Sequence, residues 1–198
     1  MAGRYYSLNE YLKRKYGEKV YKFPVNLPIT CPNRDGTLDT RGCIFCHNGS
    51  SHFAEMGKDI NEQIEKAKKR VKNKIKTDKF IAYFQSFTNT YGDIDYLEHC
   101  FRTAINRDDI VALSIGTRPD CLSAPILDML ENLNKIKPVW IELGLQTSNE
   151  KSAEYIRRCY KNSVYEIFAY FSLISFIFSH PSANVRPQTN PFIKLSFL

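Results

Sequence analysis

The 198-residue sequence has no apolar run as long as the roughly 20 residues that a membrane-spanning helix needs. Its longest such run, from Ile167 to Phe178, is much shorter. The first residues, Met-Ala-Gly-Arg-Tyr-Tyr, also lack the apolar core of a secretory signal. We therefore expect a cytoplasmic protein that makes no use of a membrane.

Internal repeats and low-complexity segments are absent as well, which excludes solenoids and arrays and favours a single globular domain. The hydrophobic fraction of 43% and the charged fraction of 25% are ordinary for such a domain. The net charge of +7 permits an acidic partner such as RNA. A solvated basic surface, on the lysine-rich face of a helix over 58–79, explains the charge equally well.

Strand-like and helix-like segments alternate along the chain. Apolar or extended runs occupy 20–30, 80–85, 110–115 and 139–145, and helical periodicity follows over 60–75, 93–105, 123–133 and 148–158. Such alternation predicts a parallel sheet covered by helices, with its chemistry at the carboxyl ends of the strands.

Six cysteines without a secretory signal indicate metal or redox use rather than a disulfide framework. Cys31, Cys43 and Cys46 form a C-x11-C-x2-C pattern just after the first extended segment. Three thiolates on one loop can hold an iron–sulfur cluster and leave one iron open for a ligand. Cys100, Cys121 and Cys159 lie apart from this loop, and we expect them to be inert thiols.

Three other uses of the cysteine loop remain open at this stage. A structural zinc site could add His47 or His52 to the three cysteines. The C-x2-C pair could be a redox motif, although Cys31 would then have no role. The cysteines could also simply be buried.

Several segments resemble one family. Thr30 to Thr37 and Gly42-Cys-Ile-Phe-Cys46 resemble the cluster loop of the radical SAM superfamily, in its YhcC-type, Elongator-like branch. Tyr83 to Tyr91, Ser114 to Asp120 and Glu142 to Thr147 resemble the strand-end motifs of that branch, and they occur in the same order. The resemblance covers residues 5–160.

The resemblance implies an α/β fold, a partial, incomplete TIM-like βα barrel with parallel strands and outer helices. It implies a [4Fe–4S] cluster on Cys31, Cys43 and Cys46, which reduces S-adenosylmethionine (SAM) to a 5′-deoxyadenosyl radical. The SAM contacts that it suggests are Phe45, Gln85, Ser86, Thr117, Arg118, Glu142 and Gln146. For Arg118 with Asp120, an ion pair that closes the third loop is the alternative.

The same resemblance implies an electron donor of flavodoxin or ferredoxin type as partner, and it makes a modified tRNA a reasonable substrate. The chain divides into a radical SAM core over 1–160 and a hydrophobic tail over 161–198 that does not match the family. No charged residue stands between Glu166 and Arg186, and we expect this tail to dock imperfectly. A basic binding module stabilised by Fe–S or zinc, and an inactive fragment of a radical SAM enzyme, are the alternative interpretations.

Overall fold

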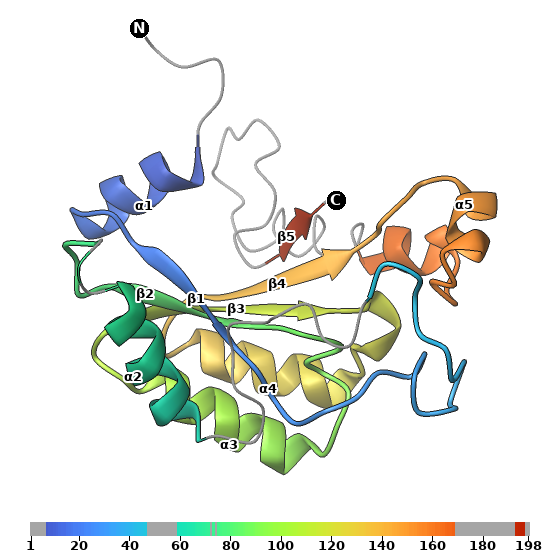
Figure 1. Ribbon diagram of the computed structural model, residues 1–198, viewed down its shortest axis with the longest axis horizontal. Coiled ribbons are helices and arrows are strands. Elements are labelled where there is room, and N and C mark those ends of the chain that lie inside the picture. The colour runs from blue at the N-terminus through green and yellow to red at the C-terminus, as the bar shows by residue number, and fades with distance from the viewer. Residues whose placement is uncertain (1–6, 47–58, 72, 74, 169–192, 197–198) are drawn as a thin grey trace, which may run out of the picture.

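A computed structural model describes residues 7–46, 59–71, 73, 75–168 and 193–196. Parallel strands form one five-stranded sheet in the order β1-β2-β3-β4-β5, and they run in the same direction in Figure 1. The strands are β1 (Tyr21–Val25), β2 (Phe80–Phe84), β3 (Ile110–Thr117), β4 (Val139–Gly144) and β5 (Ile193–Ser196). Because β1 and β5 are the two edges of this sheet, the described strands form an open sheet and not a closed barrel.

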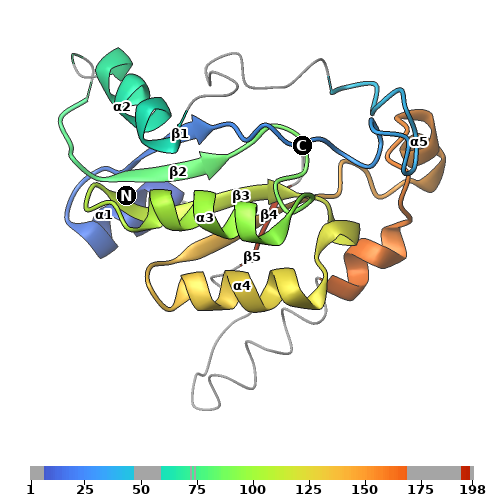
Figure 2. The same ribbon diagram turned by 90° about the horizontal axis from the view of Figure 1, so that it is seen from below.

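Three helices cover one face of the sheet, as Figure 2 shows: α2 (Ile60–Val71), α3 (Ile94–Ile105) and α4 (Ala124–Asn134). Their apolar stripes meet the strand side chains of that face in the main core, where Ile64, Phe101 and Leu133 are fully buried. Asp93 caps α3 by accepting a hydrogen bond from the backbone N–H of Tyr96 at 2.8 Å. This face therefore explains why the strands and helices alternate in the sequence.

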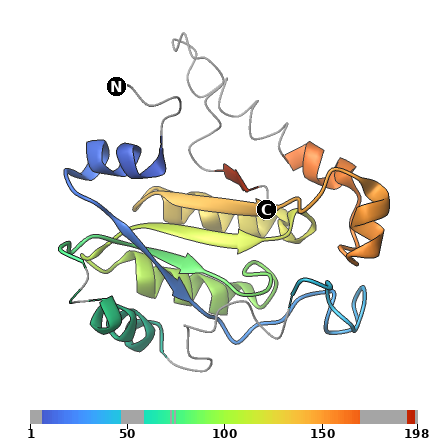
Figure 3. The same cartoon turned by 45° about the horizontal axis from the view of Figure 1, so that its top comes forward.

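The opposite face of the sheet carries a smaller core under helix α1 (Leu8–Tyr16), which lies apart from the other helices in Figure 3. Leu12 packs there with Ile81, Ala112 and Trp140, near the start of the strands. The carboxyl-terminal half of this face is left to polar side chains, and the candidate site lies there.

An ion pair spans this face of the sheet. Lys22 on β1 donates to Glu142 on β4, although β2 and β3 lie between them. In a flat sheet, strands three positions apart are about 14 Å from each other, since neighbours are about 4.8 Å apart. The pair fits a sheet that curls toward this face, and the fold is a partial TIM-like barrel with outer helices, which confirms the expected fold class.

Several element boundaries differ from those expected. The helix expected over 148–158 is the short α5 (Glu150–Tyr155), and a 3-10 turn, Pro119–Cys121, follows β3. The first strand ends at Val25, three residues before Pro28, so the rest of the expected extended segment is a loop. Among the described residues, no helix is long and apolar enough to cross a membrane.

The start of the expected tail is helical over 162–168, and Tyr165 is buried in the main core. The strand β5 pairs in parallel with β4 at the other end of the tail. Residues 169–192 and 197–198 lie outside the described part of the chain, so the expected loose docking of the whole tail stays a prediction.

Candidate active site

A cavity of about 330 Å³ opens on the curved face, at the carboxyl ends of the strands. The loops that follow β1, β2, β3 and β4 all contribute to its wall. Every side chain assigned to the site from the sequence lines this one cavity: Cys31, Cys43, Phe45, Cys46, Gln85, Ser86, Thr117, Arg118, Glu142 and Gln146. Their roles are not tested by this placement, but residues spread over 116 positions of the chain (146 − 31 + 1) are brought together.

The cysteine loop folds back on itself so that Cys31 and Cys43 face the same space. The carbonyl of Cys31 accepts the backbone N–H of Arg34 at 2.8 Å, and the carbonyl of Cys43 accepts that of Cys46 at 3.0 Å. Gly42 has a φ of +73°, and a Cβ there would lie 3.1 Å from the Arg34 guanidinium. Glycine at this position lets the chain turn back just before Cys43.

The segment after α5 supports the cysteine loop from behind. The backbone N–H of Ile44 donates to the carbonyl of Ile156 at 3.2 Å. Arg158 is 1% exposed, and its guanidinium donates to the carbonyls of Leu145, Thr147 and Tyr160. We call residues 156–160 the strap, because they tie the cysteine loop to the end of β4.

The surroundings of Cys43 keep its thiol protonated in the absence of a metal, because its pKa lies above the ordinary value. Burial raises the pKa of the Cys43 thiol, while the amide of Asn33 and the guanidinium of Arg118 act in the opposite direction. Arg118 is 8% exposed and makes two hydrogen bonds to Asp120, at 2.9 and 2.7 Å. Burial acts to lower the pKa of Arg118, but these bonds outweigh it and hold the pKa above its ordinary value. The Arg118–Asp120 ion pair, which was the alternative interpretation, is thus present, while the role of Arg118 as a SAM contact stays a prediction.

Glu142 is held at the floor of the cavity by partners from other strands. Its Oε1 accepts hydrogen bonds from Lys22 on β1 and from Ser114 on β3, the latter at 2.6 Å. Tyr83 on β2 also lines the cavity. The pKa of its phenol is raised, mainly by burial and to a smaller extent by the Glu142 carboxylate. The carboxylate is 8% exposed and is therefore oriented and charge-compensated.

The three cysteines of the loop could hold either a zinc ion or an iron–sulfur cluster, and the two need different arrangements of the sulfur atoms. In the described part of the chain, no group of three or more His, Cys, Asp or Glu side chains is arranged so that it could hold a metal ion. A single zinc ion needs its thiolates at about 2.3 Å from one centre, whereas an iron–sulfur cluster gives each cysteine its own iron. Three thiols that line one cavity, beside a guanidinium and an amide donor, match the second requirement in the kind of ligand that they offer. His47 and His52 lie outside the described residues.

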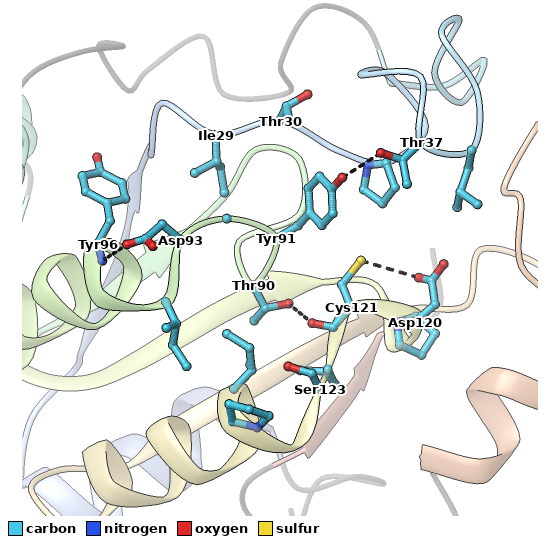
Figure 4. Close-up of a pocket in the computed structure, with 18 of the residues that line it drawn as sticks. Ile29, Thr30, Thr37, Thr90, Tyr91, Asp93, Tyr96, Asp120, Cys121 and Ser123 are labelled. Atoms are coloured by element: carbon cyan, nitrogen blue, oxygen red, sulfur yellow. Dashed lines mark hydrogen bonds between the residues drawn. The ribbon is translucent and has the colours of Figure 1, made fainter.

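The other cysteines lie away from this cavity wall. Cys100 is buried in α3, Cys159 is exposed in the strap, and Cys121 lines a larger groove of about 1590 Å³ beside the helices. Figure 4 shows this groove, where the Thr90 hydroxyl donates to the carbonyl of Cys121 at 2.7 Å. Burial, with a smaller effect of Asp120, raises the pKa of Cys121 to about 12, so its thiol is neutral.

Sequence reasoning missed several side chains that build the site, above all Lys22, Tyr83, Asn33 and Arg158. One signal was available for Lys22: it stands in an extended apolar segment, as Glu142 does, and opposite charges in two such strands favour pairing. No comparable signal marks Asn33 or Arg158, because the backbone carbonyls that they bind, and the Cys43 sulfur beside Asn33, are brought near only by the fold.

Comparison with known proteins gives three findings on the family. The model of the radical SAM superfamily matches residues 40–174. The uncharacterised protein YtqA of Bacillus subtilis is 42% identical over 164 residues, 82% of this chain and 51% of YtqA. The protein YhcC of Escherichia coli K12 is 38% identical over 157 residues, 78% of this chain and 50% of YhcC.

A solved structure shares the fold. The archaeal Methanocaldococcus infernus Elp3 with an N-terminal deletion superposes with a TM-score of 0.53 at 16% identity, covering 90% of this chain and 46% of that one. The chain thus spans about half the length of the relatives and of the structure that it matches.

Proposed function

The chain belongs to the radical SAM superfamily, with relatives of the YhcC type, and on that premise we propose that it binds a [4Fe–4S] cluster and SAM in the cavity described above. The observation that carries the proposal is that Cys31, Cys43 and Cys46 line one cavity together with the polar side chains at the strand ends. When bound, the cluster supplies the electron that splits SAM into methionine and a 5′-deoxyadenosyl radical.

The residues of the cavity would then divide the work of holding SAM. Phe45, which is 50% exposed at the rim, offers a flat apolar surface to the adenine. Gln85 and Ser86, at the end of β2, would meet the amino group of the methionine. Glu142, oriented by Lys22, would accept a hydrogen bond from the ribose or the ammonium group.

Arg118, Thr117 and Gln146 would complete the polar wall. Three of the five N–H groups of Arg118 are engaged, two by Asp120 and one by the carbonyl of Arg158. The remaining guanidinium surface would attract the SAM carboxylate. Thr117 shares a hydrogen bond of 2.6 Å with Thr90, so its hydroxyl is fixed at the cavity wall.

An external one-electron donor of flavodoxin or ferredoxin type is the partner that this chemistry needs. An RNA, in particular a modified tRNA, is the substrate class that we propose, in keeping with the net charge of +7. We also propose that this chain can cleave SAM by itself once it carries the cluster and receives an electron.

Anaerobic reconstitution tests the cluster. Purified protein should bind about four irons with matching sulfide, and its reduced EPR spectrum should change when SAM is added. Each of Cys31→Ala, Cys43→Ala and Cys46→Ala should abolish the visible iron–sulfur absorption. The buried Cys100, which lies outside the cavity, provides the matched control, and Cys100→Ala should keep that absorption. One tightly bound zinc with no iron would instead favour the binding-module alternative.

A further inference from the structure

Asn33 lies between Cys31 and Cys43 in the sequence and is fully buried, at 0% exposed. Its Nδ2 group has three acceptors in reach: the Sγ of Cys43 at 3.3 Å, the carbonyl of Arg157 at 2.8 Å and that of Arg158 at 3.2 Å. Its Oδ1 has no hydrogen-bond partner among the described residues. Turning the amide over would set Oδ1 against these acceptors, so the environment fixes the N–H groups toward the sulfur.

The sulfur of Cys43 changes from a hydrogen-bond donor to an acceptor when it binds iron. As a thiol, it donates its own proton to the carbonyl of Arg157, at 3.3 Å. A cysteine that ligates iron has lost this proton. The sulfur and the carbonyl oxygen would then face each other as two acceptors. Asn33 has two N–H groups and lies within hydrogen-bond distance of both atoms, so it can donate to each of them.

We propose that Asn33 is a positioning residue for the cluster, whose amide N–H donates to the iron-bound sulfur of Cys43 and stabilises the reduced state. The inference rests on the proposed function, because it needs a cluster on Cys43. Hydrogen bonds to the cysteine sulfur are among the factors that set the reduction potential of such clusters. The reduced cluster carries one more negative charge, so an N–H donor stabilises it more and raises the potential.

The chain offers a closely matched control in Asn89. This asparagine is also fully buried, and its Oδ1 also has no partner within the described part of the chain. Its Nδ2 group donates to the carbonyls of Phe84, Ser86 and Gly116, at 3.1, 3.1 and 2.9 Å. Asn33 and Asn89 therefore tie backbone segments in the same way, but the partners recorded for Asn89 include no sulfur.

The experiment compares Asn33→Leu with Asn89→Leu in the anaerobically reconstituted chain without SAM. Both variants should unfold at a lower temperature than the original chain. An EPR-monitored redox titration should give a more negative midpoint potential for Asn33→Leu, and an unchanged potential for Asn89→Leu. An Asn33→Leu cluster with the original potential would overturn the proposal, as would an equal shift in both variants.

A measurement on the unaltered chain decides the matter even if Asn33→Leu does not fold. With 15N-labelled asparagine, pulsed EPR of the reduced cluster should show a 15N coupling that Asn33→Asp lacks, since its carboxylate has no N–H to donate. A cluster without this coupling would refute the role of Asn33 but leave the proposed function standing. Failure of the unaltered chain to assemble a [4Fe–4S] cluster would refute the proposed function and this inference with it.

Discussion

Glu142 and Lys22 place opposite charges on the same face of two strands that are not neighbours. Their pairing depends on the fold, so the opposite charges in two apolar strands were a signal in the sequence, but only the structure shows that Lys22 and Glu142 meet. The pair also sharpens the proposed role of Glu142, because a carboxylate fixed from two sides, by Lys22 and Ser114, has a defined orientation toward the cavity. A positioned carboxylate binds a ligand hydroxyl more tightly than a mobile one.

Replacing Glu142 by Gln tests this role with little change in shape. The variant loses a charge-assisted hydrogen bond to SAM, so its affinity for SAM should fall roughly tenfold, or about 1.4 kcal/mol. Iron content should stay unchanged. Calorimetry on the reconstituted protein measures the affinity, and Glu131→Gln on the exposed surface of α4 is the control. Unchanged SAM affinity would mean that the Lys22–Glu142 pair serves the fold alone.

Cys159 shows how a single backbone angle can cost stability. Its φ is +62°, in the left-handed region where a side chain costs about 1–2 kcal/mol. Glycine relieves this strain and loses about 0.5–1 kcal/mol through the entropy of the unfolded chain. Cys159→Gly should therefore stabilise the protein by about 0.5–1 kcal/mol in urea unfolding. Cys159→Ala keeps the Cβ and should leave stability unchanged, so an equal gain in both would place the effect in the thiol.

Among the elements, the strands and the outer helices could be predicted because their apolar periodicity alone specifies them. Helix α1 was missed, although Ser7 and Glu10 form a capping box that its sequence spells out: the Ser7 side chain accepts the N–H of Glu10 at 3.1 Å, and the Glu10 carboxylate accepts that of Ser7 at 3.0 Å. The strap could not be predicted, since it has no periodicity. It is held by one buried guanidinium whose partners are carbonyls from elsewhere in the fold.

The strap yields a prediction about stability. Arg158→Met keeps the length of the side chain but leaves the buried carbonyl of Leu145 and the partly buried carbonyls of Thr147 and Tyr160 without their donor. Each such carbonyl costs about 1–3 kcal/mol, so the variant should lose about 3 kcal/mol or more of unfolding free energy. Arg102→Met removes a more exposed arginine, paired with Glu98 on α3, and should cost at most about 1 kcal/mol. Similar losses in both variants would show that the strap contributes little.

For the whole molecule, the sequence predicted a partial barrel, and the described fold agrees; the candidate cavity lies at the carboxyl ends of the strands. The parallel order of β1 to β4 follows from strands that alternate with helices, because right-handed crossovers leave few other arrangements. The fifth strand, β5, could not be predicted. It lies in the tail, whose sequence does not resemble the family and shows no clear helical or strand periodicity. What a sequence pattern determines here is the repeating unit, while the edges depend on contacts distant in the chain.

The unfolding free energy of the whole molecule should depend on pH at the acid end. The reason is a cluster of charged side chains that joins α2 to the start of β3. Asp109 accepts hydrogen bonds from Arg107, at 2.9 and 2.8 Å, and from Lys68 on α2, at 2.7 Å. Arg107 also reaches Glu65 on α2. Burial acts to raise the pKa of Asp109, but these hydrogen bonds outweigh it and lower the pKa to about 2.

Because this pKa is lower in the folded state than in the unfolded chain, where an aspartate titrates at about 3.9, the ionised Asp109 stabilises the fold above about pH 4. That contribution is lost as the pH falls from about 4 to about 2, since the unfolded chain takes up the proton first. Asp109→Asn should lower the unfolding free energy by about 1 kcal/mol at pH 7 and make it fall less steeply between pH 4 and pH 2. Urea unfolding across this range measures both effects.

Asp108→Asn removes the same charge from an exposed neighbour, and it should keep the steep acid dependence of the original chain. Equal slopes for Asp109→Asn and the original chain would show that the cluster does not couple the fold to pH.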